Sequence, residues 1–271
     1  MPSDAQDRCA LFLPSLEGGG AERVMMNLAG GLAERGIPTD LVLASAKGPY
    51  LAQLSPQVRL VDLGATRVLS SFAPLVRYLR RSRPAAVISA LDYANLVAVG
   101  ANLAAGAPSR VIATVHNQLT VPRESAPSRK ERLVRRFLRP ALARAHAVVA
   151  VSDGVADDLS ATTGLPRGSV QTIYNPVISA AVLARGEEPV AHPWFAPGQA
   201  PVILGIGRFY EQKDFATLLR AFARLPQDLE CRLVILGDGP GRPELEALVR
   251  ELGLGERVAL PGFVANPYAY L

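Results

Sequence analysis

The chain has 271 residues, of which 49% are hydrophobic and 20% charged, and its formal net charge is +5. This composition is ordinary for a globular protein and excludes a collagen-like, low-complexity or disordered chain. The mild positive charge permits an anionic partner, such as a phosphorylated ligand, a membrane surface or nucleic acid, without requiring one.

The cysteines and the amino terminus bear on the compartment. Cys9 and Cys231 each lie in an apolar run, which indicates two buried thiols in a reducing compartment rather than a disulfide. No cysteine and histidine spacing suggests a zinc site. The polar amino terminus lacks the order of a signal peptide, and no apolar run is long enough to span a membrane. We therefore expect a cytoplasmic protein.

Short apolar runs alternate along the chain with segments of helical periodicity. In the first part we expect strands at 9–13, 39–44, 58–62, 86–89, 110–115, 147–151 and 170–173, and helices at 21–35, 72–81, 93–105, 128–145 and 154–163. A second series has strands at 202–207, 232–236 and 257–260 and helices at 214–225 and 243–252. The strands show little alternation, which is typical of parallel strands covered on both faces. The pattern predicts a doubly wound α/β architecture.

Helical and strand periodicity is lost between Asn175 and Pro201, a stretch with five prolines. We predict an N-terminal Rossmann-like domain at 1–175, a linker at 176–200 and a second Rossmann-like domain at 201–271. The second domain has material for only three strands and two helices, which is a small sheet to bury. The chain stops at N-P-Y-A-Y-L, where a further helix is expected to begin. We therefore expect a C-terminally truncated chain whose second domain is incomplete.

The first motif is S-L-E-G-G-G-A-E-R-V, in which Gly18, Gly19 and Gly20 lie between a strand and a helix. Amide protons and the helix dipole at such a turn favour an anion. A tight turn that binds nothing is equally consistent with the glycines. The spacing is not G-x-G-x-x-G, which disfavours an NAD-dependent dehydrogenase.

Two cations follow the first strand of the second domain, in G-I-G-R-F-Y-E-Q-K-D. Arg208 comes directly after Gly207, and Lys213 follows five residues later. At the end of a parallel strand such a pair can grip a diphosphate, the arginine bidentately and the lysine as a point charge. The plain alternative is two exposed loop cations. A similar transition in G-D-G-P places Gly239 where it could line a nucleotide site or form a simple turn.

Three further features could serve function. His116, in T-V-H-N-Q, ends the strand at 110–115 and could donate hydrogen bonds or move protons, although a lone histidine is more often structural. His146 and His192 are weaker candidates. The basic segment Pro127–Arg144 could lie on anionic lipid or be a solvated surface helix. No nucleic-acid-binding module accompanies it, so we expect no nucleic-acid partner.

Hydrolase and nucleotide-triphosphatase signatures are missing from the sequence: it has no G-x-S-x-G, H-E-x-x-H or G-K-[ST]. The motifs that it does have share one order. L-P-S-L-E-G-G-G-A-E-R, V-H-N, V-S-D-G-V, I-Y-N-P-V, G-I-G-R-F-Y-E-Q-K-D and L-G-D-G-P-G-R-P-E-L together resemble glycosyltransferase family 4. The resemblance runs from about residue 10 to the end. It implies the GT-B fold and a retaining transferase that uses a UDP- or GDP-sugar and no metal.

The resemblance also implies roles for the candidate residues. Arg208 and Lys213 would hold the donor diphosphate in the second domain, and the Gly18–Gly20 loop would close over the donor phosphates and the acceptor. His116 would lie beside the transferred sugar. The loop at 261–264, with Phe263 and Val264, would lie beside the nucleobase.

One part of the family pattern is missing: two glutamates separated by seven residues, which contact the donor sugar and ribose, would come after Leu271. We therefore expect little or no transfer by this chain, and a parent enzyme that transfers sugar to a saccharide or polyprenyl-linked acceptor in cell-surface polysaccharide biosynthesis. Contact with the inner face of the cytoplasmic membrane follows from the basic segment and from family habit. The alternatives are a nucleotide-sugar 2-epimerase and a non-catalytic module that binds a nucleotide-sugar.

Overall fold

The computed structural model describes residues 8–120, 129–178, 180–226 and 228–271. The polar residues 1–7 and residues 127 and 128 of the basic segment lie outside the described part. The chain divides into two compact units, Met1–Val177 and Ile178–Leu271.

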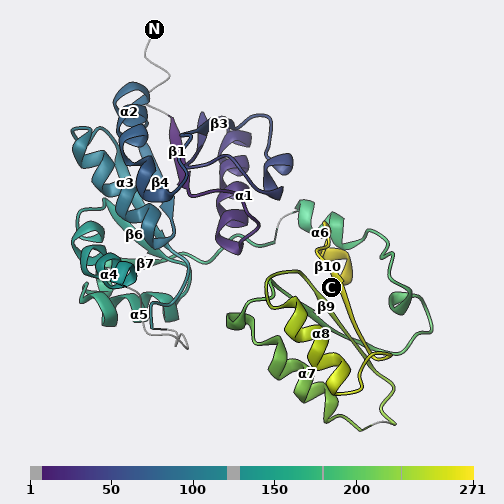
Figure 1. The fold of residues 1–271 in the computed structure, drawn as a ribbon. Coiled ribbons are helices and arrows are strands. Elements are labelled where there is room, and N and C mark those ends of the chain that lie inside the picture. Colours follow the sequence, from purple (N-terminus) through teal and green to yellow (C-terminus); the bar gives the residue numbers. More distant parts are fainter. Residues whose placement is uncertain (1–7, 121–128, 179, 227) are drawn as a thin grey trace. The chain divides into compact units, whose positions relative to one another are not determined.

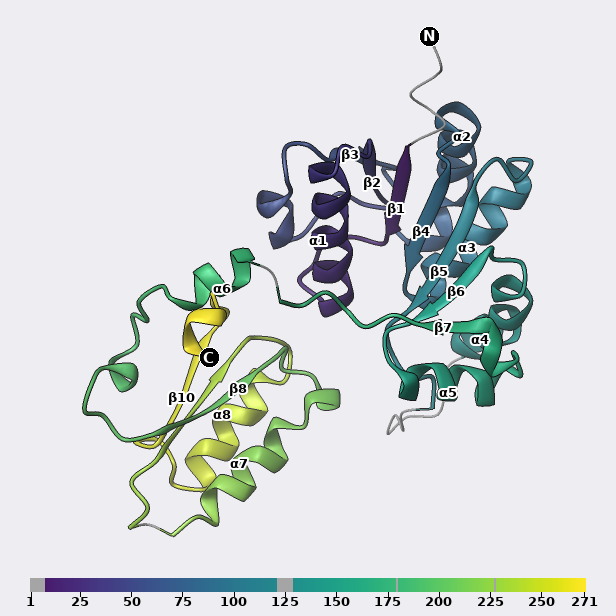
Figure 2. The same cartoon turned by 180° about the vertical axis from the view of Figure 1, so that it is seen from behind.

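Unit 1 is built on a sheet of seven parallel strands (Figures 1 and 2). The strands are β1 (Cys9–Leu13), β2 (Thr39–Leu43), β3 (Arg59–Asp62), β4 (Ala86–Ala90), β5 (Arg110–Val115), β6 (Ala147–Ala150) and β7 (Val170–Thr172). Their order in the sheet is β3-β2-β1-β4-β5-β6-β7. The chain therefore winds outward from β1 to one edge and then outward from β4 to the other, which is the doubly wound topology expected from the alternation of strands and helices.

Helices cover both faces of this sheet. They are α1 (Gly20–Glu34), α2 (Phe72–Ser82), α3 (Asp92–Ala104), α4 (Arg129–Leu142) and α5 (Asp153–Thr163), with short 3₁₀ turns at Pro49–Gln53, Val68–Ser71 and Arg167–Ser169. Along β1, Phe12 packs in the core beneath α2 and α3, whereas Leu11 and Leu13 pack in the core beneath α1. Alternate residues thus point to opposite faces, and since both faces are apolar the strand is buried throughout.

Unit 2 contains three parallel strands, β8 (Val202–Ile206), β9 (Arg232–Leu236) and β10 (Val258–Gly262), in the order β10-β9-β8. Its helices are α6 (Ala180–Gly186), α7 (Phe215–Ala223) and α8 (Arg242–Glu251), with 3₁₀ turns at Pro193–Phe195, Glu211–Lys213 and Tyr268–Tyr270. Leu233 and Ile235 of β9 pack with Phe222 and Leu245 in a core beneath α7 and α8.

Most of the segment that the sequence sets apart as a linker, 176–200, belongs to unit 2. Side chains and backbone near Arg185 hold it to the last residues of the chain. Arg185 Nη2 donates to the Ala265 carbonyl at 2.7 Å, and Asn266 Nδ2 donates to the Arg185 carbonyl at 2.8 Å. The Arg185 guanidinium also lies 5.5 Å from the centre of the Tyr268 ring. These partners are about 80 residues away in sequence, which explains why local periodicity gives no sign of α6.

Cys9 and Cys231 are both free and buried, as the sequence predicts. In the part of the chain that the structure describes, none of the helices combines the length and the apolar character that crossing a membrane requires.

Candidate functional site

The predicted site residues all follow the ends of parallel strands, whereas the weaker candidates His146 and His192 do not. Within unit 1, the glycine segment follows β1 and His116 follows β5; within unit 2, the other candidates follow β8, β9 and β10: Gly207, Arg208, Lys213, Gly239, Phe263 and Val264. Open α/β sheets bind ligands beyond the carboxyl ends of their strands. The topology therefore gathers the candidates of each unit at the edge of its sheet where a ligand is expected.

The glycine segment contains a turn with a positive φ at Gly18 and the start of α1 at Gly19. Gly18 has a φ of +97°, which favours glycine, whereas a Cβ on Gly20 would meet nothing within 4 Å. The Gly19 amide donates to Oε2 of Glu22 at 2.6 Å, and the Gly19 carbonyl accepts from the Arg23 amide in the first turn of α1. Gly19 is the N-cap of α1, and the buried Glu22 at position N3 reaches back to it as in a capping box, so it occupies one of the amides that the sequence leaves for an anion.

A second turn lies against the glycine segment. Gly48 has a φ of +116°, and a Cβ on it would lie 2.0 Å from the Leu16 carbonyl oxygen, so only glycine fits. The Leu16 amide donates to the Lys47 carbonyl at 2.9 Å, and Tyr50 Oη donates to the Gly18 carbonyl at 3.3 Å. The Arg23 guanidinium stacks 3.8 Å from the centre of the Tyr50 ring. Sequence reasoning missed Gly48 and Tyr50 because their partners lie some thirty residues earlier in the chain.

His116 has a defined tautomer. The Thr114 hydroxyl donates to the Ser89 carbonyl at 2.8 Å, so its oxygen is left to accept from Nε2 of His116 at 3.1 Å. Burial lowers the pKa of His116 below its usual value, so the imidazole is neutral at pH 7. The proton is then on Nε2, and Nδ1 is a hydrogen-bond acceptor.

A buried polar network holds Thr114, the hydrogen-bond partner of His116. Ser89 Oγ donates to Oδ1 of Asn95 at 2.6 Å, and Asn95 Nδ2 donates to the Thr114 carbonyl at 2.9 Å. Both Ser89 and Asn95 have no exposed surface. The network joins the ends of β4 and β5 to the first turn of α3, and because its members satisfy one another it holds the histidine in one place.

In unit 2, Lys213 folds back over Gly207. A Cβ on Gly207 would lie 3.4 Å from Cγ and Cδ of Lys213 and 3.2 Å from the ring of Phe215. The reversal of the chain is made by Asp214, whose φ of +48° lies in the left-handed region and whose side chain caps α7 at the Thr217 amide. The lysine stem therefore lies beside the backbone that carries Arg208, and the two cations share the end of β8.

Close glycine contacts join the loops after the three strands of unit 2. Gly237 has a φ of +137°, and a Cβ there would lie 1.9 Å from the Gly207 carbonyl oxygen. Gly239 has a φ of +157°, and a Cβ there would lie 2.8 Å from the Phe209 carbonyl oxygen. The Phe209 amide donates to the Asp238 carbonyl at 2.9 Å, and the Gly237 amide donates to the Gly262 carbonyl at 2.8 Å. Gly239 thus has a packing reason to be glycine, whatever it binds.

Arg242 organises these loops, and sequence reasoning missed it. Its guanidinium donates to Asp238 at 3.0 Å, to Glu246 at 2.9 Å and to the Leu260 carbonyl at 3.3 Å. Its central carbon lies 5.4 Å from the centre of the Phe209 ring. One side chain on α8 therefore contacts the loop after β8, the loop after β9 and the strand β10.

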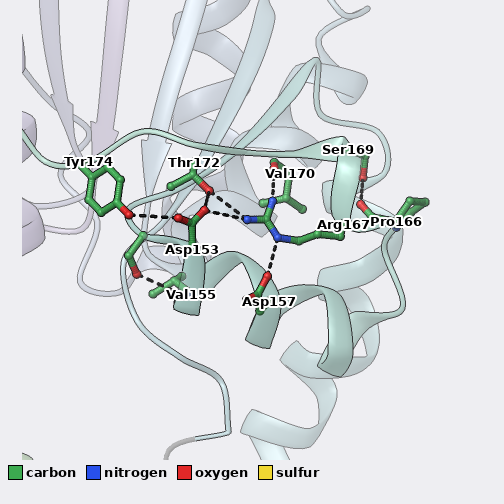
Figure 3. A network of polar contacts seen from close by, with 10 residues as sticks. Asp153, Val155, Asp157, Pro166, Arg167, Ser169, Val170, Thr172 and Tyr174 are labelled. Atoms are coloured by element: carbon green, nitrogen blue, oxygen red, sulfur yellow. Dashed lines mark hydrogen bonds and ion pairs between the residues drawn. The ribbon is translucent and has the colours of Figure 1, made fainter.

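The motif V-S-D-G-V forms a separate polar network at the end of unit 1 (Figure 3). Asp153, at the start of α5, accepts from Thr172 Oγ1 at 2.7 Å, from Arg167 Nη2 at 2.9 Å and from Tyr174 Oη at 3.1 Å. Arg167 Nε also donates to Asp157 at 2.6 Å. Hydrogen bonds from Thr172 and Tyr174 lower the pKa of Asp153. The network fastens the chain that leaves β7 to α5, and it contains none of the predicted site residues.

Among the described residues, no three histidine, cysteine, aspartate or glutamate side chains gather in a way that could hold a metal ion.

Comparison with known families gives two matches that together span most of the chain. A family model described as Glycosyltransferase Family 4 matches residues 18–180, and one described as Glycosyl transferases group 1 matches residues 190–271. The boundary between these matches lies close to the boundary between the two units.

Curated relatives match parts of the chain. An N-acetylgalactosaminyltransferase of Campylobacter jejuni, whose name gives a diphospho-undecaprenol-linked acceptor, is 36% identical over 140 residues, or 51% of this chain and 36% of that protein. The lipopolysaccharide core biosynthesis glycosyltransferase LpsD of Rhizobium meliloti is 41% identical over 96 residues, or 35% of this chain and 27% of that protein. The matched regions thus span about a third of these relatives.

Solved structures share the fold over nearly the whole chain. The lipopolysaccharide outer core galactosyltransferase WaaB has a TM-score of 0.64 at 22% identity, and the match covers 96% of this chain and 69% of WaaB. Anabaena HepE, solved with UDP and glucose, has a TM-score of 0.74 at 18% identity, and the match covers 97% of this chain and 71% of HepE. At these identities the likeness shows the fold.

Proposed function

The chain belongs to Glycosyltransferase Family 4, and from that premise we propose that it acts in the transfer of a sugar from a nucleotide-sugar donor to a saccharide or lipid-linked acceptor, with retention of configuration. The family and the GT-B fold predicted from the motifs are confirmed by the family matches and the solved structures. We also propose the substrate classes and the roles of the site residues.

One observation carries the proposal: Arg208 and Lys213 share the end of β8, with the lysine stem folded over Gly207. Cleavage of a sugar from a nucleoside diphosphate leaves negative charge on the leaving phosphate. Two cations at this position would stabilise that charge most where it develops, so they would accelerate bond cleavage without a metal ion. A UDP- or GDP-linked sugar is the donor class that such a pair fits, and the HepE structure was solved with UDP.

His116 can position the transferred sugar. Its Nδ1 accepts hydrogen bonds, so we propose that it receives one from a sugar hydroxyl and holds the ring at the reacting carbon. A neutral imidazole also adds no charge that would oppose an oxocarbenium-like transition state. Phe263 and Val264, after β10, are proposed to lie beside the nucleobase, and the Gly18–Gly20 segment to contact the donor phosphates.

The names of two relatives support a proposal for the class of acceptor. The Campylobacter relative is named for a lipid-linked acceptor and the Rhizobium relative for lipopolysaccharide core biosynthesis. We propose a saccharide or polyprenyl-linked acceptor in cell-surface polysaccharide biosynthesis. The two free cysteines support a reducing compartment, and we place the protein in the cytoplasm, in contact with the inner face of the membrane.

The test is calorimetry with UDP and with GDP on the 271-residue chain. We expect one of the two nucleotides to bind, and Arg208→Ala and Lys213→Ala each to weaken binding by about 10- to 100-fold, the value of a charge-assisted hydrogen bond. The matched control is Arg220→Ala, an exposed arginine on α7, which should leave the affinity within twofold. Binding that ignores both substitutions, or no binding of either nucleotide, would contradict the proposed donor site.

A further inference from the structure

The loop after β10, residues 263–266, is fastened to α6, a helix to which the proposed donor site gives no role. Arg185 Nη2, on α6, donates to the Ala265 carbonyl at 2.7 Å, and the Arg185 guanidinium lies 5.5 Å from the centre of the Tyr268 ring. Both views show α6 beside the turn Tyr268–Tyr270 (Figures 1 and 2). The segment through which the chain enters unit 2 therefore holds the loop that follows β10.

Asn266 lies at the centre of this contact, because both polar atoms of its side chain are used. Nδ2 donates to the Arg185 carbonyl at 2.8 Å and to Oε2 of Glu188 at 2.7 Å. Oδ1 accepts from the Tyr268 amide at 3.2 Å. Two acceptors on one side and a donor on the other allow one orientation of the amide group, so the loop is held in one position.

The chemistry of the loop after β10 differs from that of the loop after β8. Residues 258–271 carry no charged side chain, whereas Arg208 and Lys213 follow β8. The Phe263 ring is 58% exposed at the start of the loop. A loop with an exposed aromatic ring and no cation fits a planar, uncharged group better than it fits a second phosphate, because bases stack on aromatic side chains.

The two loops are a nucleotide's length apart. β8 and β10 lie on either side of β9, and since neighbouring strands are about 4.8 Å apart, the ends of β8 and β10 are about 10 Å apart. The loops are also joined, because the Gly237 amide donates to the Gly262 carbonyl at 2.8 Å and Gly237 packs against the Gly207 carbonyl. A ligand whose diphosphate lies at the end of β8 can therefore place its base at Phe263.

We propose that Arg185 and Asn266 are positioning residues for the nucleobase of the donor. They hold the loop 263–266 against α6, so that Phe263 presents a fixed ring on which the base stacks. The inference rests on the proposed function, since it takes the diphosphate to lie at Arg208 and Lys213. A contact that only stabilised the fold would affect every ligand of unit 2 alike, whereas a positioning contact affects the base and leaves the phosphates bound.

The experiment is calorimetry of the 271-residue chain with UDP, with GDP and with pyrophosphate, which has the two phosphates and no base. We expect Arg185→Met and Asn266→Asp each to weaken binding of the preferred nucleotide by about tenfold, because the loop would hold its binding conformation for about a tenth of the time. The affinity for pyrophosphate should stay within about twofold, since Arg208 and Lys213 are unchanged and lie on another loop.

Arg232→Met is the matched control. It removes the same charge, one side-chain hydrogen bond, to Gln199 at 3.0 Å, and one aromatic contact, with the Trp194 ring at 4.9 Å. Arg232 begins β9 and so lies at the amino end of the strands, which means that both affinities should stay within about twofold. Adding Glu188→Gln to Asn266→Asp gives the new carboxylate a donor and should restore most of the lost nucleotide affinity.

A double-mutant cycle connects the loop to the base. Phe263→Leu should weaken nucleotide binding and leave pyrophosphate binding unchanged. Combined with Asn266→Asp it should cost little more than either change alone, because both act through the same stacking contact. Circular dichroism and the fluorescence of Trp194 show whether each variant is folded.

The inference alone is overturned by any of three results: nucleotide affinity that ignores both α6-contact variants, equal losses of nucleotide and pyrophosphate affinity in them, or full additivity with Phe263→Leu. Failure of the donor site gives a different result. If pyrophosphate did not bind the unmodified chain, or if its binding ignored Arg208→Ala, the proposed function and this inference would both be overturned.

Discussion

Asp40 is the most deeply buried charged residue in the described part of the chain. Its side chain has no exposed surface, and it accepts hydrogen bonds from Arg8 Nη1 at 2.6 Å, Arg59 Nε at 2.9 Å and Tyr78 Oη at 2.6 Å. Burial alone would raise the pKa of Asp40, but these hydrogen bonds lower it below its usual range. Burial and the nearby Asp40 charge raise the pKa of Cys9 to about 11, so that thiol remains protonated and unreactive.

Replacing Asp40 with asparagine (Asp40→Asn) tests how much this charge contributes to stability. The variant leaves two arginines without their counter-ion, and because Arg59 is half-exposed we expect a loss of roughly 2–3 kcal/mol, below the value for a fully buried pair. A depressed folded pKa gives stability that is present above the unfolded pKa of about 3.9 and is lost as the pH falls through the folded value.

Urea unfolding of unit 1, monitored by hydrogen exchange of its peptides at several pH values, measures both the loss of stability and its pH dependence. The unmodified chain should lose stability below about pH 4, whereas the asparagine variant should lack that part of the pH dependence. If the free energy of unfolding of the two chains changed with pH in parallel, the hydrogen bonds to Asp40 would not lower its pKa.

Asp40 also shows what the sequence could and could not predict at this scale. The sequence placed an aspartate at the start of an apolar strand, but its partners lie 19 to 38 residues away and no local pattern connects them. His116 was found because it ends a strand. The tautomer of His116 could not be predicted, since it depends on Thr114 and on the Ser89 carbonyl of the neighbouring strand.

At the scale of elements, the loops after β8 and β9 and the strand β10 are joined because one side chain of α8, that of Arg242, contacts all three. The sequence predicts the glycine turns after β8 and β9 from their composition and the loop at 261–264 from the family resemblance. It could not identify Arg242 as the residue that joins them, because the Leu260 carbonyl and the Phe209 ring are brought to the guanidinium only by the parallel pairing of the strands.

Arg242→Met should loosen these loops and leave the strands intact. Methionine keeps much of the apolar stem but loses the hydrogen bonds to Asp238, Glu246 and Leu260. Since each such bond contributes about 1 kcal/mol, we expect the amides of Phe209, Gly237 and Gly241 to exchange with solvent about tenfold faster or more. Hydrogen exchange read by NMR gives the result, with Arg220→Met on α7 as the control. Unchanged exchange at all three amides would mean that the glycine packing alone holds the loops.

At the scale of the whole molecule, the two units have separate apolar cores. The order and type of most elements could be read from the sequence: the expected strands at 9–13, 110–115 and 232–236 are β1, β5 and β9 as observed. Buried parallel strands give this clear signal because most of their residues are apolar. α6 and the extent of unit 2 could not be read, since both depend on contacts between Arg185 and residues near the end of the chain.

Separate cores predict separate losses of stability. In Gly237→Ala the new Cβ would lie 1.9 Å from the Gly207 carbonyl oxygen, at a φ of +137°. We expect unit 2 to lose about 3 kcal/mol or more. Gly255→Ala is the matched control, because its Cβ would meet nothing within 4 Å and its backbone is not in the left-handed region.

Trp194 lies in unit 2 and is the single tryptophan of the sequence, so its fluorescence reports the unfolding of unit 2 alone. Hydrogen exchange of unit 1 peptides should be unchanged in both variants. If Gly237→Ala lowered the stability of both units equally, the chain would unfold as one cooperative body.

The carboxylate of Glu22 on the Gly19 amide means that α1 already carries a bound anion of its own. A tethered group acts at an effective concentration on the order of millimolar or higher. Dilute monovalent anions in a buffer therefore compete poorly for this amide. A ligand that takes the place of Glu22 needs several simultaneous contacts with the protein. The start of α1 therefore favours anions that make several contacts over simple monovalent anions, before any contact with a sugar or a base is made.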